Sequence, residues 1–144
     1  MSQYRGEILG SEVVIDLERT KEWYSQSEEW PCTCGHCRNF LALAKQRLLL
    51  PSMMELLDKF SIVPEKATYV CELDHNDKGH LYEISYRVAG RMLEKEREDL
   101  EEYSWGGGGC GHNPYPYGAP GFPEPHFDLE FFVTLPWVLD EPDE

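Results

Sequence analysis

The chain has 144 residues, of which 41% are hydrophobic and 12% aromatic, and its formal net charge is -14. This length is typical of one domain, and the aromatic content excludes a disordered chain. Residues 1–97 contain 13 basic and 16 acidic side chains, whereas residues 98–144 contain 11 acidic ones and no Lys or Arg. The negative electrostatic field of this acidic region repels phosphate backbones and anionic lipid, so we expect no nucleic-acid or membrane partner. If the chain has a protein partner, we expect that partner to be basic.

The start of the chain, Met1 to Arg5, has no basic stretch followed by a long apolar run. No segment approaches the roughly 18 consecutive apolar residues that a membrane span needs. We therefore expect a cytoplasmic protein. An odd number of cysteines, five, favours free thiols or metal ligands over a disulfide framework in that compartment.

The N-terminal half is predicted to form one strand followed by helices. β-branched residues indicate a strand over 11–17, and apolar residues at helical spacing indicate helices over 18–27 and 40–48. Pro51 is typical of a first helical position, and Ser52 with Glu55 resembles a capping box for a helix that runs to about residue 60.

The C-terminal half is predicted to be mainly strands. A hairpin is expected from strands 68–73 and 81–92 with a turn at 75–79, because apolar residues alternate from Tyr82 to Val88. A last strand is expected over 127–134. Together these elements predict a single α+β domain over residues 1–144, with an antiparallel sheet of about four strands packed with N-terminal helices. A loop rich in Gly, Pro and aromatic residues is expected at about 104–125, and an acidic tail at about 140–144.

Three cysteines close together are the strongest chemical signal. Cys32, Cys34 and Cys37 place three soft ligands within six residues, so their thiolates could converge on one tetrahedral ion, for which zinc is the best match. A fourth protein ligand would make the site structural. The candidates, in order of preference, are Cys110 and His112 in the Gly-rich loop, Cys71 on the hairpin, and His36 within the cluster.

A second interpretation of the same residues is redox chemistry. Cys34-Gly35-His36-Cys37 reproduces the CGHC tetrapeptide of the protein disulfide isomerase family, and a predicted helix follows it. The resemblance implies that Cys34 attacks as a thiolate and that Cys37 resolves the mixed disulfide. It covers four residues, and the βαβ pattern that precedes the motif in that family is not evident here.

A longer stretch resembles a different group. The run W-P-C-T-C-G-H-C-R-N-F at residues 30–40, together with L-P-W-V-L-D-E-P at residues 135–142, is similar to uncharacterised small acidic bacterial proteins with a W-P-C-x-C-x-x-C-R-N-F signature. This resemblance implies a bacterial cytosolic origin. It carries no known function with it.

Aromatic residues in the Gly- and Pro-rich loop are the best candidates for partner binding outside the cysteines, because such rings provide a large contact area at low entropic cost. They are Trp105, Tyr115, Tyr117 and Phe122. The alternative is that these rings cover the sheet. His75 and His80 flank the predicted turn and are expected to be exposed surface residues.

The leading interpretation is a cytosolic, non-enzymatic binding or interaction protein whose cysteine cluster holds structural zinc. The alternative is a thiol-disulfide oxidoreductase that uses Cys34 and Cys37.

Overall fold

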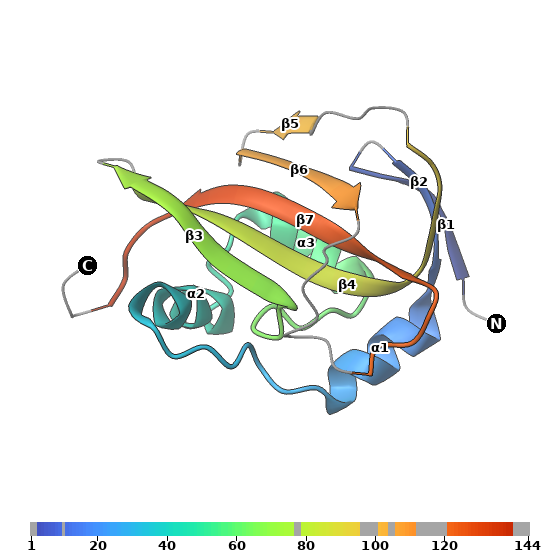
Figure 1. The fold of residues 1–144 in the computed structure, drawn as a ribbon, viewed down its shortest axis with the longest axis horizontal. Helices are drawn as coiled ribbons and strands as arrows, with labels where there is room; N and C mark the ends of the chain where they lie inside the picture. Colours follow the sequence, from blue (N-terminus) through green and yellow to red (C-terminus); the bar gives the residue numbers. More distant parts are fainter. Residues whose placement is uncertain are drawn as a thin grey trace.

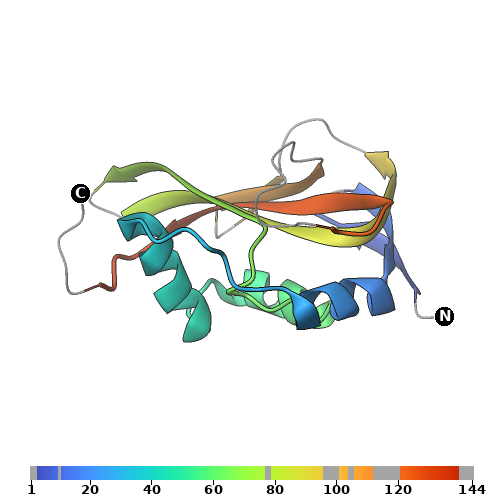
Figure 2. The same cartoon turned by 60° about the horizontal axis from the view of Figure 1, so that its bottom comes forward.

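The computed structural model describes residues 3–9, 11–76, 79–95, 101–103, 106–111 and 121–139. Within these residues, three helices lie on one side of a seven-stranded sheet (Figures 1 and 2). The helices are α1 (Leu17–Gln26), α2 (Gly35–Lys45) and α3 (Pro51–Lys59). The strands are β1 (Gln3–Ile8), β2 (Ser11–Asp16), β3 (Tyr69–Asn76), β4 (Gly79–Lys95), β5 (Glu101–Tyr103), β6 (Gly106–Gly111) and β7 (His126–Leu135).

All the strand pairs in the described residues are antiparallel, in the order β1-β2-β4-β7-β6-β5, and β3 also pairs with β4. β4 is the longest strand, with 17 residues. It pairs with β7 through residues 80–89, with β3 through residues 79–85, and with β2 through residues 90–95. The predicted α+β class is therefore confirmed, with a sheet larger than the expected four or so strands.

The core lies between the sheet and the helices. Alternate residues of β4 from Tyr82 to Val88 and alternate residues of β7 from Phe127 to Val133 have no exposed surface. Because successive side chains of a strand point to opposite faces, these residues form one apolar layer, against which Phe40 of α2 and Leu57 of α3 are also buried. The alternation that predicted the two strands is thus explained by burial under the helices.

The structure differs from the sequence expectation in several elements. Helix α2 spans Gly35–Lys45 and not residues 40–48, so it begins within the cysteine motif. Strands β1, β5 and β6 were not expected, and β6 occupies residues 106–111 of the stretch predicted to be a loop. Strand β3 continues to Asn76, beyond the predicted end at residue 73. Helix α3 begins at Pro51 as predicted, but Leu50 is its N-cap, and no side chain caps it. Ser52 therefore lies inside the helix and forms no capping box.

Gly90 joins the two halves of β4. Its φ of 140° is a conformation that other residues rarely adopt, and an added Cβ would lie 2.0 Å from the Val14 carbonyl oxygen of β2. Its N–H donates to the Pro125 carbonyl at 2.9 Å. Glycine is therefore required for β4 to pass from its pairing with β7 to its pairing with β2.

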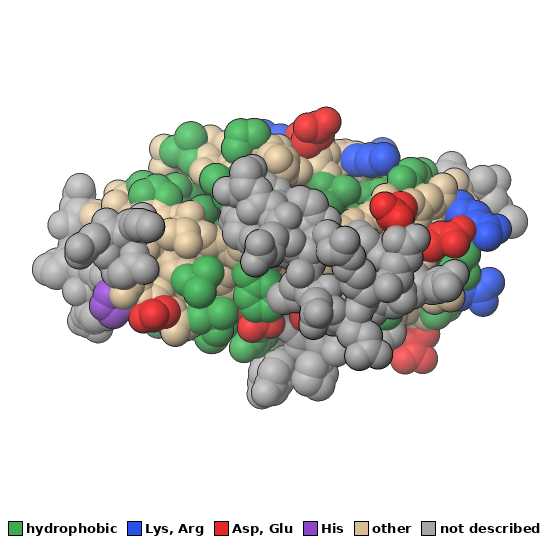
Figure 3. All heavy atoms as spheres, turned by 90° about the horizontal axis from the view of Figure 1, so that it is seen from above, with side chains coloured by type: hydrophobic (Ala, Val, Ile, Leu, Met, Phe, Trp, Pro, Cys, Tyr) green, Lys and Arg blue, Asp and Glu red, His purple; other side chains and the backbone are tan. Residues whose placement is uncertain are grey.

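In the parts of the chain that the structure describes, no helix is long and apolar enough to cross a membrane. Seen from above, apolar side chains on the described surface are interspersed with acidic and basic ones, and most of the basic ones lie toward the end that carries β1 (Figure 3).

Candidate metal centre

The three clustered cysteines surround the start of α2. Cys34 is the N-cap residue, Cys32 lies two residues before it, and Cys37 lies in the first turn. Their sulfur atoms all lie within 4.8 Å of one another, and the Cys32 and Cys34 sulfurs are 3.1 Å apart. All five cysteines of the chain are free thiols. The structure therefore brings together the three residues that the sequence singled out.

The cluster runs from solvent into the core. Cys34 is exposed, Cys32 is half-buried, and the Cys37 side chain is buried beneath them. The indole N–H of Trp30 donates a hydrogen bond to the Cys37 sulfur at 3.1 Å. Trp30 is itself held in place, because its backbone N–H donates to the Glu65 carbonyl at 3.0 Å and its ring packs edge-on against Tyr69.

Cys37 and Cys32 differ in their surroundings, and their pKa values shift in opposite directions. Burial raises the pKa of the Cys37 thiol, although the hydrogen bond from Trp30 opposes the change. Burial acts in the same direction on Cys32, but the backbone N–H of Cys34 and the thiols of Cys34 and Cys37 outweigh it, so the pKa of Cys32 is lowered. In the metal-free protein, the surroundings of Cys32 favour its thiolate, whereas those of Cys37 favour its thiol.

His36 is the candidate fourth ligand that the structure places beside the cluster. Its ring nitrogens lie 3.5 Å (Nε2) and 3.6 Å (Nδ1) from the Cys34 sulfur. Its backbone carbonyl accepts a hydrogen bond of 2.7 Å from the Tyr82 hydroxyl of β4.

Cys110 does not lie at the cluster. It pairs with Leu129 in the sheet, four residues along β7 from Val133, the partner of Tyr82. Four residues of strand span about 13 Å, too far for a shared ion. Its buried thiol instead donates to the Ile8 carbonyl at 3.4 Å.

The other proposed ligands are also elsewhere. Cys71 pairs with Glu83, so it lies on the sheet face opposite to Tyr82 and α2, and its thiol contacts the Glu72 carbonyl at 3.5 Å. His112 lies outside the described residues.

Of the four aromatic residues expected to bind a partner, the structure describes one. Phe122 is buried, and its ring contacts those of Trp23, Tyr24 and His126. It therefore packs against α1 as part of the core. The remaining three, Trp105, Tyr115 and Tyr117, lie outside the described residues.

The segment that follows β7 is attached to α2 beside the cluster. The buried side-chain amide of Asn39 donates to the Pro136 carbonyl at 3.0 Å and accepts from the Val138 N–H at 2.7 Å. It also donates to the Tyr82 hydroxyl at 3.2 Å. The Trp137 ring consequently lies against the start of α2, where a Cβ on Gly35 would contact it at 3.5 Å.

The prediction that His80 is an exposed surface residue is wrong, because only 5% of it is exposed; His75 is exposed as predicted. His80 contacts the carboxylate of Glu72, and its ring lies 5.0 Å from that of Trp137. Sequence reasoning therefore missed Glu72 and His80, as well as Trp30 and Asn39. The contact between the buried Trp30 and the buried Cys37 leaves no periodic pattern in the sequence, because the chain bends between the two residues.

Comparisons with protein-family models, with curated proteins and with solved structures found no match. The geometry of the cysteine cluster is therefore the basis for assigning a function.

Proposed function

We propose that Cys32, Cys34 and Cys37 bind one zinc ion as thiolates and that the protein is a non-enzymatic binding protein whose metal fixes the start of α2. The observation that carries this proposal is the convergence of three free thiols within 4.8 Å at one helix N-terminus. Thiolates select zinc over calcium or magnesium, which require oxygen ligands. The positive end of the helix dipole also favours the negative charge that three thiolates bring.

The spacing of the sulfurs is compatible with tetrahedral zinc. Zinc–sulfur bonds of about 2.3 Å place ligand sulfurs about 3.8 Å apart. The Cys32 and Cys34 sulfurs are 3.1 Å apart and no pair of the three is more than 4.8 Å apart, so small side-chain rotations would bring them to that value. The Trp30 N–H supplies the kind of hydrogen bond to a ligand atom that supports metal sites, here to the sulfur of Cys37. His36 or a water molecule would complete the coordination.

A groove beside the cluster is a candidate surface for a basic protein partner. It has a volume of about 520 Å³, and its lining includes two exposed carboxylates, Glu28 and Glu29, and one guanidinium, Arg38, beside Trp30, Pro31 and Cys32. The net charge of -14 would draw a basic segment toward the molecule. Free thiols are the expected state in the cytosol, which is the compartment that we propose.

Metal analysis with matched cysteine variants tests the zinc proposal. Protein purified under reducing conditions without added metal is expected to contain about one zinc per chain, in line with a single three-thiolate site. Cys34→Ser, at an exposed position, should lose most of the zinc. Cys71→Ser is the matched control, because it removes a thiol on the opposite face of the sheet and should leave the zinc content unchanged.

Two outcomes would contradict the proposal. One is a wild-type zinc content far below one per chain. The other is a Cys34→Ser variant that retains as much zinc as Cys71→Ser. A chelator should also lower the melting temperature of the wild type but not that of Cys34→Ser, because binding to the folded state alone stabilises it.

One observation favours the alternative of thiol-disulfide exchange. Cys34 is exposed at the N-terminus of α2, and the buried Cys37 follows within one turn, as the reaction requires of an attacking and a resolving thiol. The Cys34 thiolate would attack a substrate disulfide and release one substrate thiolate. Cys37 would then displace the second, so that two electrons pass to the substrate and a Cys34–Cys37 disulfide forms.

Insulin reduction separates the two functions. The zinc proposal predicts a rate no greater than that of free dithiol. A faster rate that Cys34→Ser abolishes and Cys71→Ser preserves would replace the zinc proposal with the oxidoreductase.

A further inference from the structure

A β-bulge in the β3–β4 hairpin gathers three possible metal ligands on one face of the sheet. Glu72 pairs with Tyr82 and His75 pairs with His80, although Glu72 and His75 are three positions apart in the chain and Tyr82 and His80 are two positions apart. The extra residue of β3 is absorbed by the register shift between Glu72 and Asp74. Because alternate residues of a regular strand share a face, Glu72 and His75 would otherwise point to opposite sides.

The three side chains meet at the end of this hairpin. One ligand atom from each of Glu72, His75 and His80 lies within 4.8 Å of the other two. The carboxylate of Glu72 contacts Nδ1 of His80, and the imidazole rings of His75 and His80 are stacked with centroids 5.5 Å apart. Two imidazoles and a carboxylate thus converge on a point that the exposed His75 leaves open to solvent.

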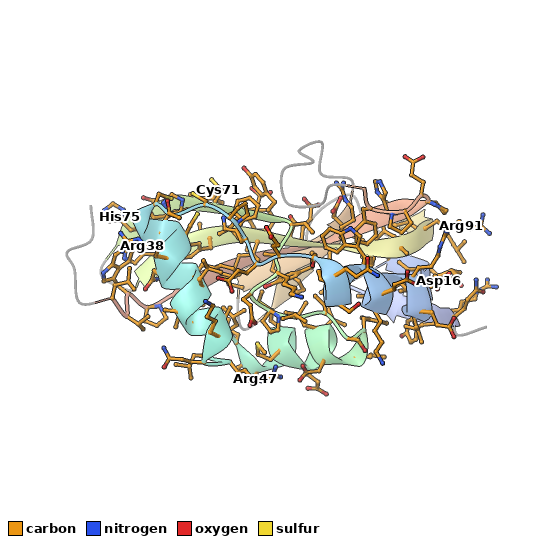
Figure 4. The ribbon with its side chains drawn as sticks, turned by 90° about the horizontal axis from the view of Figure 1, so that it is seen from below. Asp16, Arg38, Arg47, Cys71, His75 and Arg91 are labelled. Atoms are coloured by element: carbon orange, nitrogen blue, oxygen red, sulfur yellow. The ribbon has the colours of Figure 1, made fainter. Side chains whose placement is uncertain are left out.

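Two of the three possible ligands are held in place by burial. His80 is 5% exposed and Glu72 is partly buried, so both are held by the sheet, and the Trp137 ring lies 5.0 Å from His80 on one side. His75, at the margin, is free to adjust its ring. Figure 4 shows His75 and Arg38 of α2 at the same end of the molecule.

We propose that Glu72, His75 and His80 form a second metal site, which binds a divalent first-row transition-metal ion of the kind that imidazole and carboxylate ligands prefer, such as zinc, cobalt or nickel. An ion would lie between the Glu72 carboxylate and the His80 ring, which contact each other in this structure. Three protein ligands leave at least one coordination position for water or an external ligand, which is the arrangement of reactive rather than structural sites. The hairpin would therefore carry an open site near the thiolate cluster.

This proposal is independent of zinc at the cysteines, although the two sites are near each other. Both Glu72 and the thiols of Cys34 and Cys37 act on Tyr82, where burial first and then these groups raise the pKa of the phenol. The Trp137 ring lies between Gly35 of α2 and His80. The ligand atoms differ in kind, so a metal with ligand-dependent spectra can report on each site separately.

Cobalt titration of the full chain tests the proposal. Cobalt bound by thiolates gives intense sulfur-to-metal charge-transfer absorption, whereas cobalt bound by imidazole and carboxylate gives only weak d–d bands. We expect a binding event without charge transfer that quenches the fluorescence of Trp137, and this quenching should vanish in Trp137→Phe. His75→Ala should weaken that event by about tenfold or more, as loss of metal-site support does.

Asp74→Asn is the matched control. It removes the charge of a neighbouring carboxylate, which the register places opposite Leu81 on the other face, but keeps an oxygen that can accept the hydrogen bond from the His75 N–H, so it should leave the affinity unchanged. His75 is exposed, so His75→Ala should fold, which circular dichroism can verify. Equal cobalt affinity in His75→Ala and Asp74→Asn would overturn the proposal, and so would cobalt binding that is always accompanied by charge transfer. Neither result bears on zinc binding by the cysteines, which Cys34→Ser tests.

Discussion

The indole N–H of Trp30 donates a hydrogen bond to the sulfur of Cys37 across 3.1 Å, and both side chains are buried. Sulfur is a weak acceptor when it is a thiol and a stronger one when it is a charged thiolate. The hydrogen bond from Trp30 is therefore stronger when Cys37 is the thiolate, which is the form that binds metal. The hydrogen bond favours the Cys37 thiolate, whereas burial alone disfavours this charged form.

Replacing Trp30 tests this relationship. Trp30→Phe keeps an aromatic ring but removes the donor, so the affinity for zinc should fall by about tenfold, the lower end of the effect of ligand-supporting groups. Competition with a chromophoric chelator measures it. Trp23→Phe makes the same change on α1, where the ring contacts Tyr24 and Phe122, and should have no effect on zinc. Equal affinities in the two variants would show that the Trp30 donor does not support the metal.

The metal-free thiols should differ in reactivity with pH. Alkylation requires the thiolate, and the pKa of Cys32 is lowered whereas that of Cys37 is raised. In the presence of chelator, Cys32 should therefore react faster at neutral pH than a cysteine in an unstructured peptide, whose pKa is about 8.5. Cys37 should react more slowly, and its rate should rise only at higher pH or on unfolding. Mass spectrometry of iodoacetamide-treated protein identifies each site, and a faster reaction at Cys37 than at Cys32 would contradict the burial gradient.

Asn39 should control the segment that carries Trp137. Asn39→Ala removes the bonds to Pro136 and Val138 and the bond to the Tyr82 hydroxyl, all from a fully buried position. We expect a loss of about 2–3 kcal/mol in the free energy of unfolding, as for other buried groups left without partners. Acrylamide should quench tryptophan fluorescence more strongly in this variant, and the increase should disappear when Trp137→Phe is added. Unchanged quenching would mean that the segment is held by other contacts.

Gly90→Ala should be much more damaging than the same change at Gly121. Both residues have a positive φ, but a Cβ at Gly90 would overlap the Val14 carbonyl, whereas a Cβ at Gly121 would meet nothing within 4 Å. The cost at Gly121 should be about 1 kcal/mol, the backbone penalty alone, and that at Gly90 about 3 kcal/mol or more. Urea unfolding measures both. Similar costs would show that β4 can move away from β2 at this position.

The strands with alternating side chains could be predicted from the sequence, and the others could not. β4 and β7 bury every second residue, which leaves a period of two in the sequence. The strand over residues 106–111 is almost entirely glycine, so it has no side-chain pattern, and its pairing with β7 through backbone groups could not be detected.

The cysteine cluster was predictable because its members are adjacent in the chain, and local spacing sufficed to bring them together. The position of Cys110, the preferred candidate for a fourth ligand, could not be predicted, because it depends on the register of β6 on β7. Glu72, His75 and His80 were missed for a related reason. An odd spacing between Glu72 and His75 normally separates two side chains of a strand, and only the bulge places them on one face.

The length of β4 affects how the sheet unfolds. β2, β3 and β7 all form hydrogen bonds with this one strand, on both of its edges and along its full length. No partner strand can detach without uncovering backbone groups of β4, and this one strand continues through Gly90 from the half of the sheet that contains β7 into the half that contains β2. The backbone amides of β4 should consequently be the last to exchange with solvent, and the sheet should lose its structure in one cooperative step.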